Sequence, residues 1–247
     1  RVSSGRRSAA IGWHSKRKNQ TMAGIPLIDS DSTPRLPSLP ESLDRPSTLF
    51  IACGALAKEI VALKESTGWS ELTIACLPAH WHNTPQKITP AVLSKIRGMG
   101  RRFDQVYVLY GDCGTGGELD RVLEEEGIER IPGPHCYQFY MGSEEFDKTH
   151  DADPTSFYLT DYLTRHFDRI IIKGLGIDRF PELLFDYFGN YTKLIYIAQI
   201  EDERLQAKAR QAAKCLGLDY EYRFRAYGEL GDYVHAAAAG CTATVEW

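Results

Sequence analysis

Three cysteines in the body of this chain stand next to a glycine or a histidine, in the stretches ACG, DCG and HCY. They are Cys53, Cys113 and Cys136, and His82 stands in a short polar stretch of its own, WHN. A thiolate can act as a nucleophile or as a ligand of a soft metal ion, and an imidazole can act as a base or as a metal ligand. These four side chains are therefore the main candidates for chemistry.

The other three cysteines are expected to have no chemical role. Cys76 lies near the end of the strand-like run TIACL and is expected in the core, Cys215 lies in the helix-like run AAKCLGL, and Cys241 lies near the end of the chain. Six cysteines in 247 residues, with no secretory signal before them, are too few for a disulfide scaffold. We interpret all six as reduced thiols.

The elements that must position these side chains alternate between strand and helix. Apolar runs typical of buried strands cover residues 48–53, 72–77, 105–110, 128–131, 169–173, 193–198 and 220–225. Helical spacing of apolar residues covers residues 55–66, 89–102, 118–126, 157–167, 181–187 and 202–216. This alternation predicts an α/β fold: a mostly parallel, doubly wound, Rossmann-like sheet flanked by helices.

The predicted sheet brings the candidate residues to one edge. Cys53 ends the first strand, His82 follows the second, Cys113 follows the third, and Cys136 follows the short fourth run. In open parallel sheets, ligands bind in the crevice beyond the carboxyl ends of the strands. We therefore expect the three thiols and the imidazole to share one site.

The stretch GDCGTGG, residues 111–117, favours close approach of the backbone to a ligand. Its glycines tolerate positive φ, so Gly114, Gly116 and Gly117 are candidates for binding a cofactor. Cys113 precedes a predicted helix, whose N-terminus would favour the thiolate. The stretch lacks the Lys-Ser/Thr ending of a P-loop, does not fit G-x-G-x-x-G, and lacks the second glycine of a nucleophile elbow.

A soft metal ion would explain this set of residues best. Zinc or iron, including an iron–sulfur cluster, would be bound by thiolates and imidazole from separate loops, an arrangement typical of catalytic and cofactor sites. The expected metal ligands are Cys53, His82, Cys113 and Cys136. The candidate catalytic residues Asp112 and His135 would orient an imidazole or accept its proton.

Two other functions fit the same residues. In a cofactor-free cysteine enzyme of the racemase or hydrolase type, Cys53 and Cys113 would face each other across the crevice. In a non-catalytic delivery protein, the site would carry a metal ion without turnover. If the protein is an enzyme, the residues favour metal-dependent chemistry on thiol groups.

Charge and hydropathy narrow the class of partner. The net charge is -4 and the pI is about 6.0, which gives no reason to expect binding to nucleic acid or to an anionic membrane. No stretch approaches the roughly 18 apolar residues of a membrane-spanning helix. We expect a cytoplasmic protein whose partner is a small-molecule substrate.

The composition divides the chain into three parts. Residues 1–46 are basic and then rich in proline and serine, and we expect a disordered extension in which Met22 is a plausible natural start. Residues 1–21 are expected to have no function; the alternative is a targeting segment, because organelle transit peptides are also basic and poor in acidic residues. Residues 47–238 should form the α/β domain, as one body or as two intimate halves, 47–142 and 157–238. Residues 239–247 are expected to be a tail.

Five stretches carry a resemblance to a known family: IACGALAKEI, HNTP (82–85), YGDCGTGG, PGPHCYQFYMG (132–142) and FYLTDYL (157–163). From about Leu49 to Tyr233 the chain resembles the domain of unknown function numbered 1638, DUF1638. The resemblance points to the same four residues, Cys53, His82, Cys113 and Cys136, as the family's polar signature. Members resemble proteins encoded near corrinoid-dependent methyltransferases, which implies a one-carbon or corrinoid context. The resemblance thus adds three expectations: transfer of methyl groups as the activity of an enzyme, a corrinoid as the cargo of a delivery protein, and a corrinoid protein as the alternative partner.

Overall fold

The computed structural model describes residues 45–240, so the expectations for residues 1–44 and 241–247 lie outside the described residues. All the described residues belong to the unit Pro40–Trp247. Within them, no helix combines the length and the apolar character that crossing a membrane would require.

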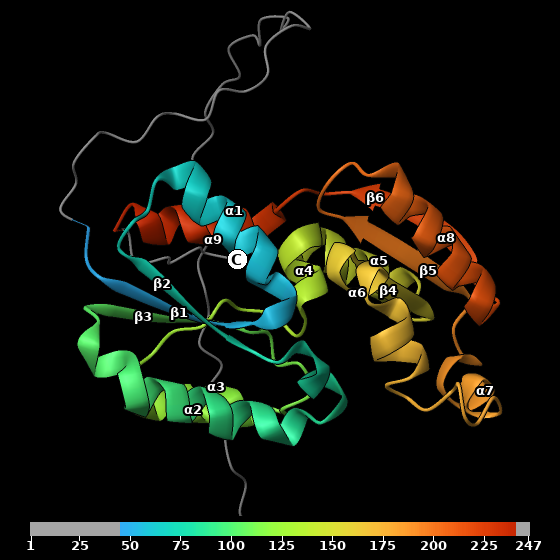
Figure 1. The fold of residues 1–247 in the computed structure, drawn as a ribbon, viewed down its shortest axis with the longest axis horizontal. Coiled ribbons are helices and arrows are strands. Elements are labelled where there is room, and N and C mark those ends of the chain that lie inside the picture. Colours follow the sequence, from blue (N-terminus) through green and yellow to red (C-terminus); the bar gives the residue numbers. More distant parts are fainter. Residues whose placement is uncertain (1–44, 241–247) are drawn as a thin grey trace, which may run out of the picture. The chain divides into compact units, whose positions relative to one another are not determined.

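The first half contains a three-stranded parallel sheet with a buried central strand. Its strands, in spatial order, are β2 (Leu72–Leu77), β1 (Thr48–Cys53) and β3 (Gln105–Leu109). Every residue of β1 is buried, as expected for a central strand covered on both faces. Figure 1 shows two helices on each face: α1 (Ala57–Thr67) with α9 (Gly228–Ala238), and α2 (Ile88–Met99) with α3 (Glu118–Glu126).

The second half repeats this arrangement with a separate sheet. Its strands, in spatial order, are β4 (Ser156–Thr160), β5 (Lys193–Ala198) and β6 (Asp219–Phe224), again all parallel. The helices of this half are α4 (Cys136–Met141), α5 (Ser143–Ala152), α6 (Asp161–Arg165), α7 (Leu183–Phe188) and α8 (Glu203–Leu216). Short 3₁₀ turns cover Gly54–Leu56, Ala79–Asn83, Pro85–Lys87 and Gly100–Arg102.

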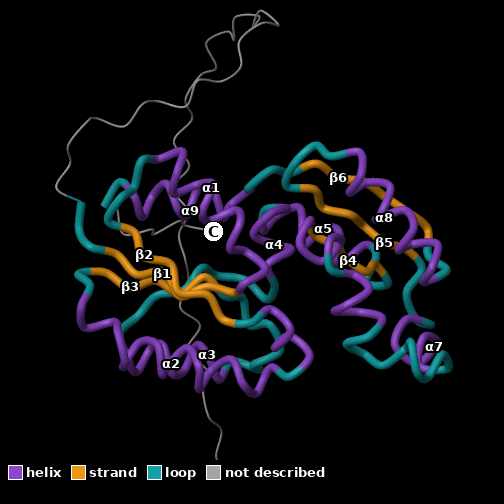
Figure 2. The backbone as a smooth tube through the Cα atoms, in the orientation of Figure 1, coloured by secondary structure: helices purple, strands orange, loops and turns teal. Residues whose placement is uncertain are grey.

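The expected parallel α/β fold is confirmed, and the strands form two sheets rather than one. Figure 2 shows the two groups of strands separately. The hydrophobic cores do not follow the order of the chain. Helix α9 comes after the second sheet in sequence, but its Leu230, Tyr233 and Val234 are part of the first core. The end of the described chain therefore holds the two halves together.

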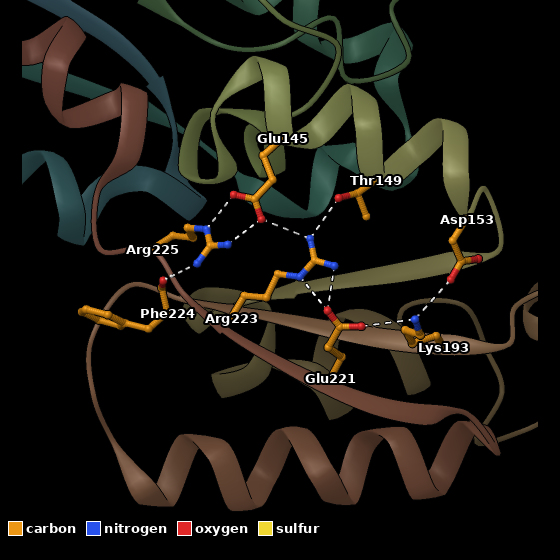
Figure 3. Close-up of polar contacts among 8 residues, drawn as sticks. All are labelled: Glu145, Thr149, Asp153, Lys193, Glu221, Arg223, Phe224 and Arg225. Carbon is orange, nitrogen blue, oxygen red and sulfur yellow. Dashed lines mark hydrogen bonds and ion pairs between the residues drawn. The ribbon is translucent and has the colours of Figure 1, made fainter. Parts of the chain in front are cut away.

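Charged side chains attach α5 to β6 in the second half (Figure 3). Arg223 contacts Glu145 at 3.3 Å and donates to the Thr149 hydroxyl at 3.0 Å, and Arg225 pairs with the same glutamate. Glu221 in turn contacts Arg223 at 2.7 Å and Lys193 at 3.2 Å. Every charge in this network has an opposite partner, so we assign it to structure rather than to binding.

One predicted strand is wrong. Residues 169–173, RIIIK, were expected to form the central strand of the second half, but Asp168–Ile172 is a π-helical segment. Its Ile170 and Ile171 are buried in the second core, so the apolar pattern reports burial correctly. A run of three isoleucines is too short to separate a strand from a helical turn by periodicity.

One predicted helix is also wrong in its first half. Residues 157–167 were expected to be helical, but Ser156–Thr160 is strand β4 and only Asp161–Arg165 is helix α6. Thr160 marks the boundary, because its hydroxyl accepts a hydrogen bond from the Leu163 amide at 3.4 Å as a helix N-cap. The aromatic and branched residues of β4 suit a buried strand better than a helix.

Two smaller expectations need correction. The run 128–131 forms only a single parallel bridge, between Val108 and Arg130, and not a strand. Cys76 was expected in the core, but its residue is exposed. The physical reason is that β2 is an edge strand of its sheet. Solvent can therefore reach side chains that the helices would cover on the central strand.

Candidate functional site

The ends of β1 and β2 meet in direct backbone contact. A Cβ atom at Gly54 would lie 2.9 Å from the Leu77 carbonyl oxygen, so glycine permits this approach where a larger residue would not. The contact places the turn after β1 against the 3₁₀ turn after β2. As a result, the Cys53 sulfur lies 4.0 Å from Nδ1 of His82.

Cys53 is held at the end of the central strand in an apolar environment. Its residue is 2% exposed, and its sulfur accepts a hydrogen bond from the Ala55 amide at 3.4 Å. Burial raises the pKa of the Cys53 thiol to about 11, and the nearby Ala55 amide and Tyr110 hydroxyl offset only part of that effect. Without an added positive charge, Cys53 is a neutral thiol at neutral pH.

His82 is oriented by a backbone carbonyl. Its Nδ1 lies 2.8 Å from the Ala79 carbonyl oxygen, which assigns the Nδ1 proton to that contact and leaves Nε2 for another partner. Burial lowers the pKa of His82, but the hydrogen bond and negative charge of Cys113, together with the Ala79 carbonyl, outweigh burial and raise it. His82 therefore lies between two of the expected thiols.

The glycine-rich loop packs against the segment that leads into α4. A Cβ atom at Gly111 would lie 2.9 Å from both the His135 amide nitrogen and the Pro134 carbonyl oxygen. The Cys113 amide donates to that same carbonyl at 2.9 Å. Cys113 adopts a positive φ of 49°, which is unusual for a residue other than glycine, and its residue is buried.

Asp112 occupies the amides that the loop was expected to offer to a cofactor. Its carboxylate accepts hydrogen bonds from the amides of Gly114 and Gly116 at 3.2 Å and of Gly117 at 2.8 Å, and from the Thr115 hydroxyl at 2.8 Å. Burial raises the pKa of Asp112, but these donors outweigh burial and lower it. Asp112 thus stabilises the loop that carries Cys113, and the predicted roles of Asp112 and the three glycines stay predictions.

Cys136 is the first residue of α4, not a loop residue as expected. It is half-buried. Burial raises its pKa well above the ordinary value, and the charges of Cys113 and Cys53 raise it further. His135 is exposed, with its ring 5.9 Å from that of Tyr137, so the predicted catalytic role of His135 stays a prediction.

The four expected ligands therefore influence one another. Cys113 interacts with His82, Cys53 lies beside His82, and the charges of Cys113 and Cys53 act on Cys136. Across residues 45–240, however, no three His, Cys, Asp or Glu side chains are placed to share a metal ion. Cys215 is exposed, and Cys241 lies outside the described residues.

Sequence reasoning did not assign a role to two residues beside this cluster. Tyr110 follows β3 directly, and its buried hydroxyl interacts with the Cys53 thiol, although no hydrogen bond of standard geometry joins it to another described residue. Glu59 of α1 is 6% exposed, its Oε2 has no hydrogen-bond partner among the described residues, and its charge acts on Cys136. The strand register could have indicated Tyr110, whereas nothing in the sequence distinguishes Glu59 from a solvated helix residue.

Comparison with known families gives one match. The model described as "Protein of unknown function (DUF1638)" matches residues 76–233, more than half of the chain. The chain belongs to the DUF1638 family. The matched region of this DUF1638 protein contains His82, Cys113 and Cys136, and it begins after Cys53. No curated protein and no solved structure matches the chain.

Proposed function

We propose that this DUF1638 protein binds a soft metal ion, zinc or iron, and uses it in thiol or methyl chemistry. The proposed ligands are Cys53, His82, Cys113 and Cys136. The observation that carries the proposal is the convergence of three thiols and an imidazole from four separate segments beyond β1, β2 and β3 and at the start of α4.

The protonation of the thiols makes the proposed metal binding depend on pH. Burial raises the pKa of Cys53 to about 11 and that of Cys136 well above its ordinary value. A divalent cation supplies the positive charge that favours the thiolate, and its binding releases the thiol protons. We therefore expect metal affinity to increase with pH.

The orientation of His82 also supports this proposal. Histidines that bind metals commonly donate the other ring N–H to a carboxylate or a backbone carbonyl, as Nδ1 of His82 does to Ala79. Nε2 would then be the ligand atom. Because no three candidate side chains are placed to share an ion, at least one of them must adopt another rotamer on binding.

A bound zinc or iron ion would act as a Lewis acid toward a substrate thiol or another heteroatom. The protein's own contribution would be a site from which water is largely excluded, because Cys53 and Cys113 are both buried. We also propose a corrinoid protein as the partner. The family resemblance alone supports this partner.

Elemental analysis after anaerobic purification tests the proposal. We expect about one zinc or iron per chain, and Cys113→Ser and Cys136→Ser each to lose it. Cys215→Ser is the matched control, because Cys215 is an exposed helix residue of the same chemistry and should retain the metal. Absence of stoichiometric metal from the parent protein, or its retention in both site variants, would contradict the proposal.

The contact between Cys113 and His82 favours a second candidate, a cofactor-free cysteine enzyme. His82 would accept the Cys113 proton and leave a thiolate nucleophile. This function predicts selective alkylation of Cys113 in metal-free protein, with loss of activity. A delivery protein would instead bind metal without multiple turnovers on thiol or methyl-donor substrates.

A further inference from the structure

Cys113 and Cys136 belong to segments that are in direct backbone contact. The Cys113 amide donates to the Pro134 carbonyl oxygen at 2.9 Å, and a Cβ atom at Gly111 would lie 3.0 Å from the Cα atom of His135. Cys136 is the next residue after His135, at the start of α4. A disulfide joins residues whose Cα atoms lie within about 7 Å of each other, so adjoining segments are the first requirement for one.

The two thiols also act on each other electrostatically. Burial raises the pKa of Cys136 most, and the negative charge of Cys113 raises it further, by more than the charge of Cys53 does. Cys113 and Cys136 are both free thiols, the first 6% exposed and the second half-buried. A pair enclosed in this way favours a reagent close to water in size, such as hydrogen peroxide, over a bulky one.

His82 separates Cys113 from the third thiol of the cluster and gives Cys113 an acidic partner. The Cys53 sulfur lies 4.0 Å from Nδ1 of His82, the nitrogen that contacts the Ala79 carbonyl. Against the effect of burial, the hydrogen bond and negative charge of Cys113 raise the pKa of His82. A protonated imidazole stabilises a thiolate, which is the form that oxidants attack, and it can donate a proton to a leaving group. Cys113 is therefore the expected nucleophile, and Cys136 rather than Cys53 is its expected partner.

We propose that Cys113 and Cys136 form a dithiol site that reduces hydroperoxides and is itself oxidised to a disulfide. This activity goes beyond the proposed metal binding and requires no metal ion. In the first step the Cys113 thiolate attacks the terminal oxygen of the hydroperoxide and the O–O bond breaks. The leaving oxygen takes a proton from His82, which becomes neutral, and Cys113 becomes a sulfenic acid.

The second step forms the disulfide. The Cys136 sulfur attacks the Cys113 sulfur, so the S–S bond forms and the S–O bond breaks. The departing hydroxide takes the Cys136 proton and leaves as water. Two thiols and one hydroperoxide thus give one disulfide, one water and one alcohol, or a second water when the oxidant is hydrogen peroxide.

Hydrogen peroxide, added to the full-length chain after treatment with a chelator, tests the proposal. We expect the intact protein to lose the mass of two hydrogen atoms, and peptide mapping to join Cys113 to Cys136 by a bond that dithiothreitol reverses. Cys136→Ser should stop at the sulfenic acid, which dimedone labels at Cys113, and Cys113→Ser should give neither product. Cys53→Ser and Cys215→Ser are the matched controls and should form the same disulfide as the parent protein.

His82→Gln tests the proton donor. We expect it to slow disulfide formation by about 100-fold, the lower end of the contribution of a positioned acid, and an unchanged rate would overturn the role of His82. In the parent protein, the absence of a disulfide, or a disulfide between any other two cysteines, would overturn the proposal. Mapping of the parent protein involves no substitution, so it decides the pair even if a variant fails to fold.

Discussion

The carboxyl ends of the two sheets have the same topology but opposite chemistry. At the end of β4, Asp161 is fully buried and accepts hydrogen bonds from the Tyr196 hydroxyl at 2.7 Å and the Gln199 amide at 3.2 Å. Arg165 lies 3.3 Å from the same carboxylate. At the end of β1 and β3, by contrast, Cys53 is a buried neutral thiol, and the Tyr110 hydroxyl interacts with it without a hydrogen bond of standard geometry.

This difference separates a structural edge from a candidate site. The Gln199 side chain completes the pairing in the second sheet, because its Oε1 accepts from the Asp161 amide at 2.7 Å and its Nε2 donates to the Ile197 carbonyl. Buried polar groups that are fully paired stabilise a fold and leave nothing for a ligand. Topology therefore permits a site at both edges, and the complete pairing of Asp161 assigns that side chain to structure.

The largest expected effect comes from breaking the paired edge. Asp161→Ala would leave the Tyr196 hydroxyl and the Gln199 amide without their acceptor, and we expect the free energy of unfolding to fall by about 3 kcal/mol. Urea denaturation measures this. Glu144→Gln is the control, because its ion pair with Lys148 is exposed and should contribute less than about 0.5 kcal/mol. Equal effects would show that the hydrogen bonds of Asp161 add no more stability than a surface ion pair.

A smaller effect is expected from the backbone contact that positions Cys113. Gly111→Ala would place a Cβ atom 2.9 Å from the backbone of Pro134 and His135, and we expect a loss of about 2 kcal/mol with weaker metal binding. Gly98→Ala in α2 is the matched control, since a Cβ atom there meets nothing within 4 Å and should stabilise the helix by about 0.5 kcal/mol. Thermal unfolding of both variants tests this.

Glu59 gives a prediction about pH. Burial is the main cause that raises the pKa of Glu59; the charge of Asp161 adds to the rise, and a backbone hydrogen bond with the charges of Arg165 and Lys58 offsets only part of it. The folded state therefore holds the proton more tightly than the unfolded state, so stability is greatest below the ordinary glutamate pKa and falls as pH rises through the raised one. In Glu59→Gln, urea denaturation across this range should show a weaker decline. An unchanged pH profile would exclude Glu59 as its source.

The smallest expected effect is a difference in the rates at which the cysteines of the intact protein react with an alkylating reagent. With iodoacetamide at neutral pH, exposed Cys76 and Cys215 should react first, and Cys53 should react more than about 10-fold more slowly because it is buried and its thiol is protonated. Mass spectrometry of partly labelled peptides measures the order. In urea, the difference should disappear. Rapid labelling of Cys113 in the folded protein would favour the cysteine-enzyme alternative.

Much of the fold followed from local patterns. The runs 48–53, 72–77 and 193–198 are β1, β2 and β5 with the same bounds, because buried strands in parallel sheets have continuous apolar sequences. The errors occurred at short apolar runs, where periodicity does not separate strand from helix: RIIIK is a π-helical segment, and Ser156–Thr160, at the start of the predicted helix 157–167, is strand β4. In both cases burial was predicted correctly and geometry was not.

The proximity of three candidate site residues was also predictable from the sequence. The rule that parallel strands end at one edge predicted that Cys53, His82 and Cys113 would lie near one another, and they do. The same rule could not show that the Asp112 carboxylate accepts hydrogen bonds from the glycine amides. These amides could otherwise donate to a bound phosphate, but a carboxylate of the same loop already occupies them. It also gave no role to Tyr110.

The amino-acid sequence by itself determined the α/β class, the family, and the four residues that could do chemistry, because these depend on residue types and on their order along strands. Only the tertiary structure decided that the strands form two sheets, that α9 packs in the first core, and that Tyr110 and Glu59 lie beside the thiols. The physical reason is that hydrogen-bond satisfaction and charge are set by neighbours distant in sequence, which local periodicity does not report.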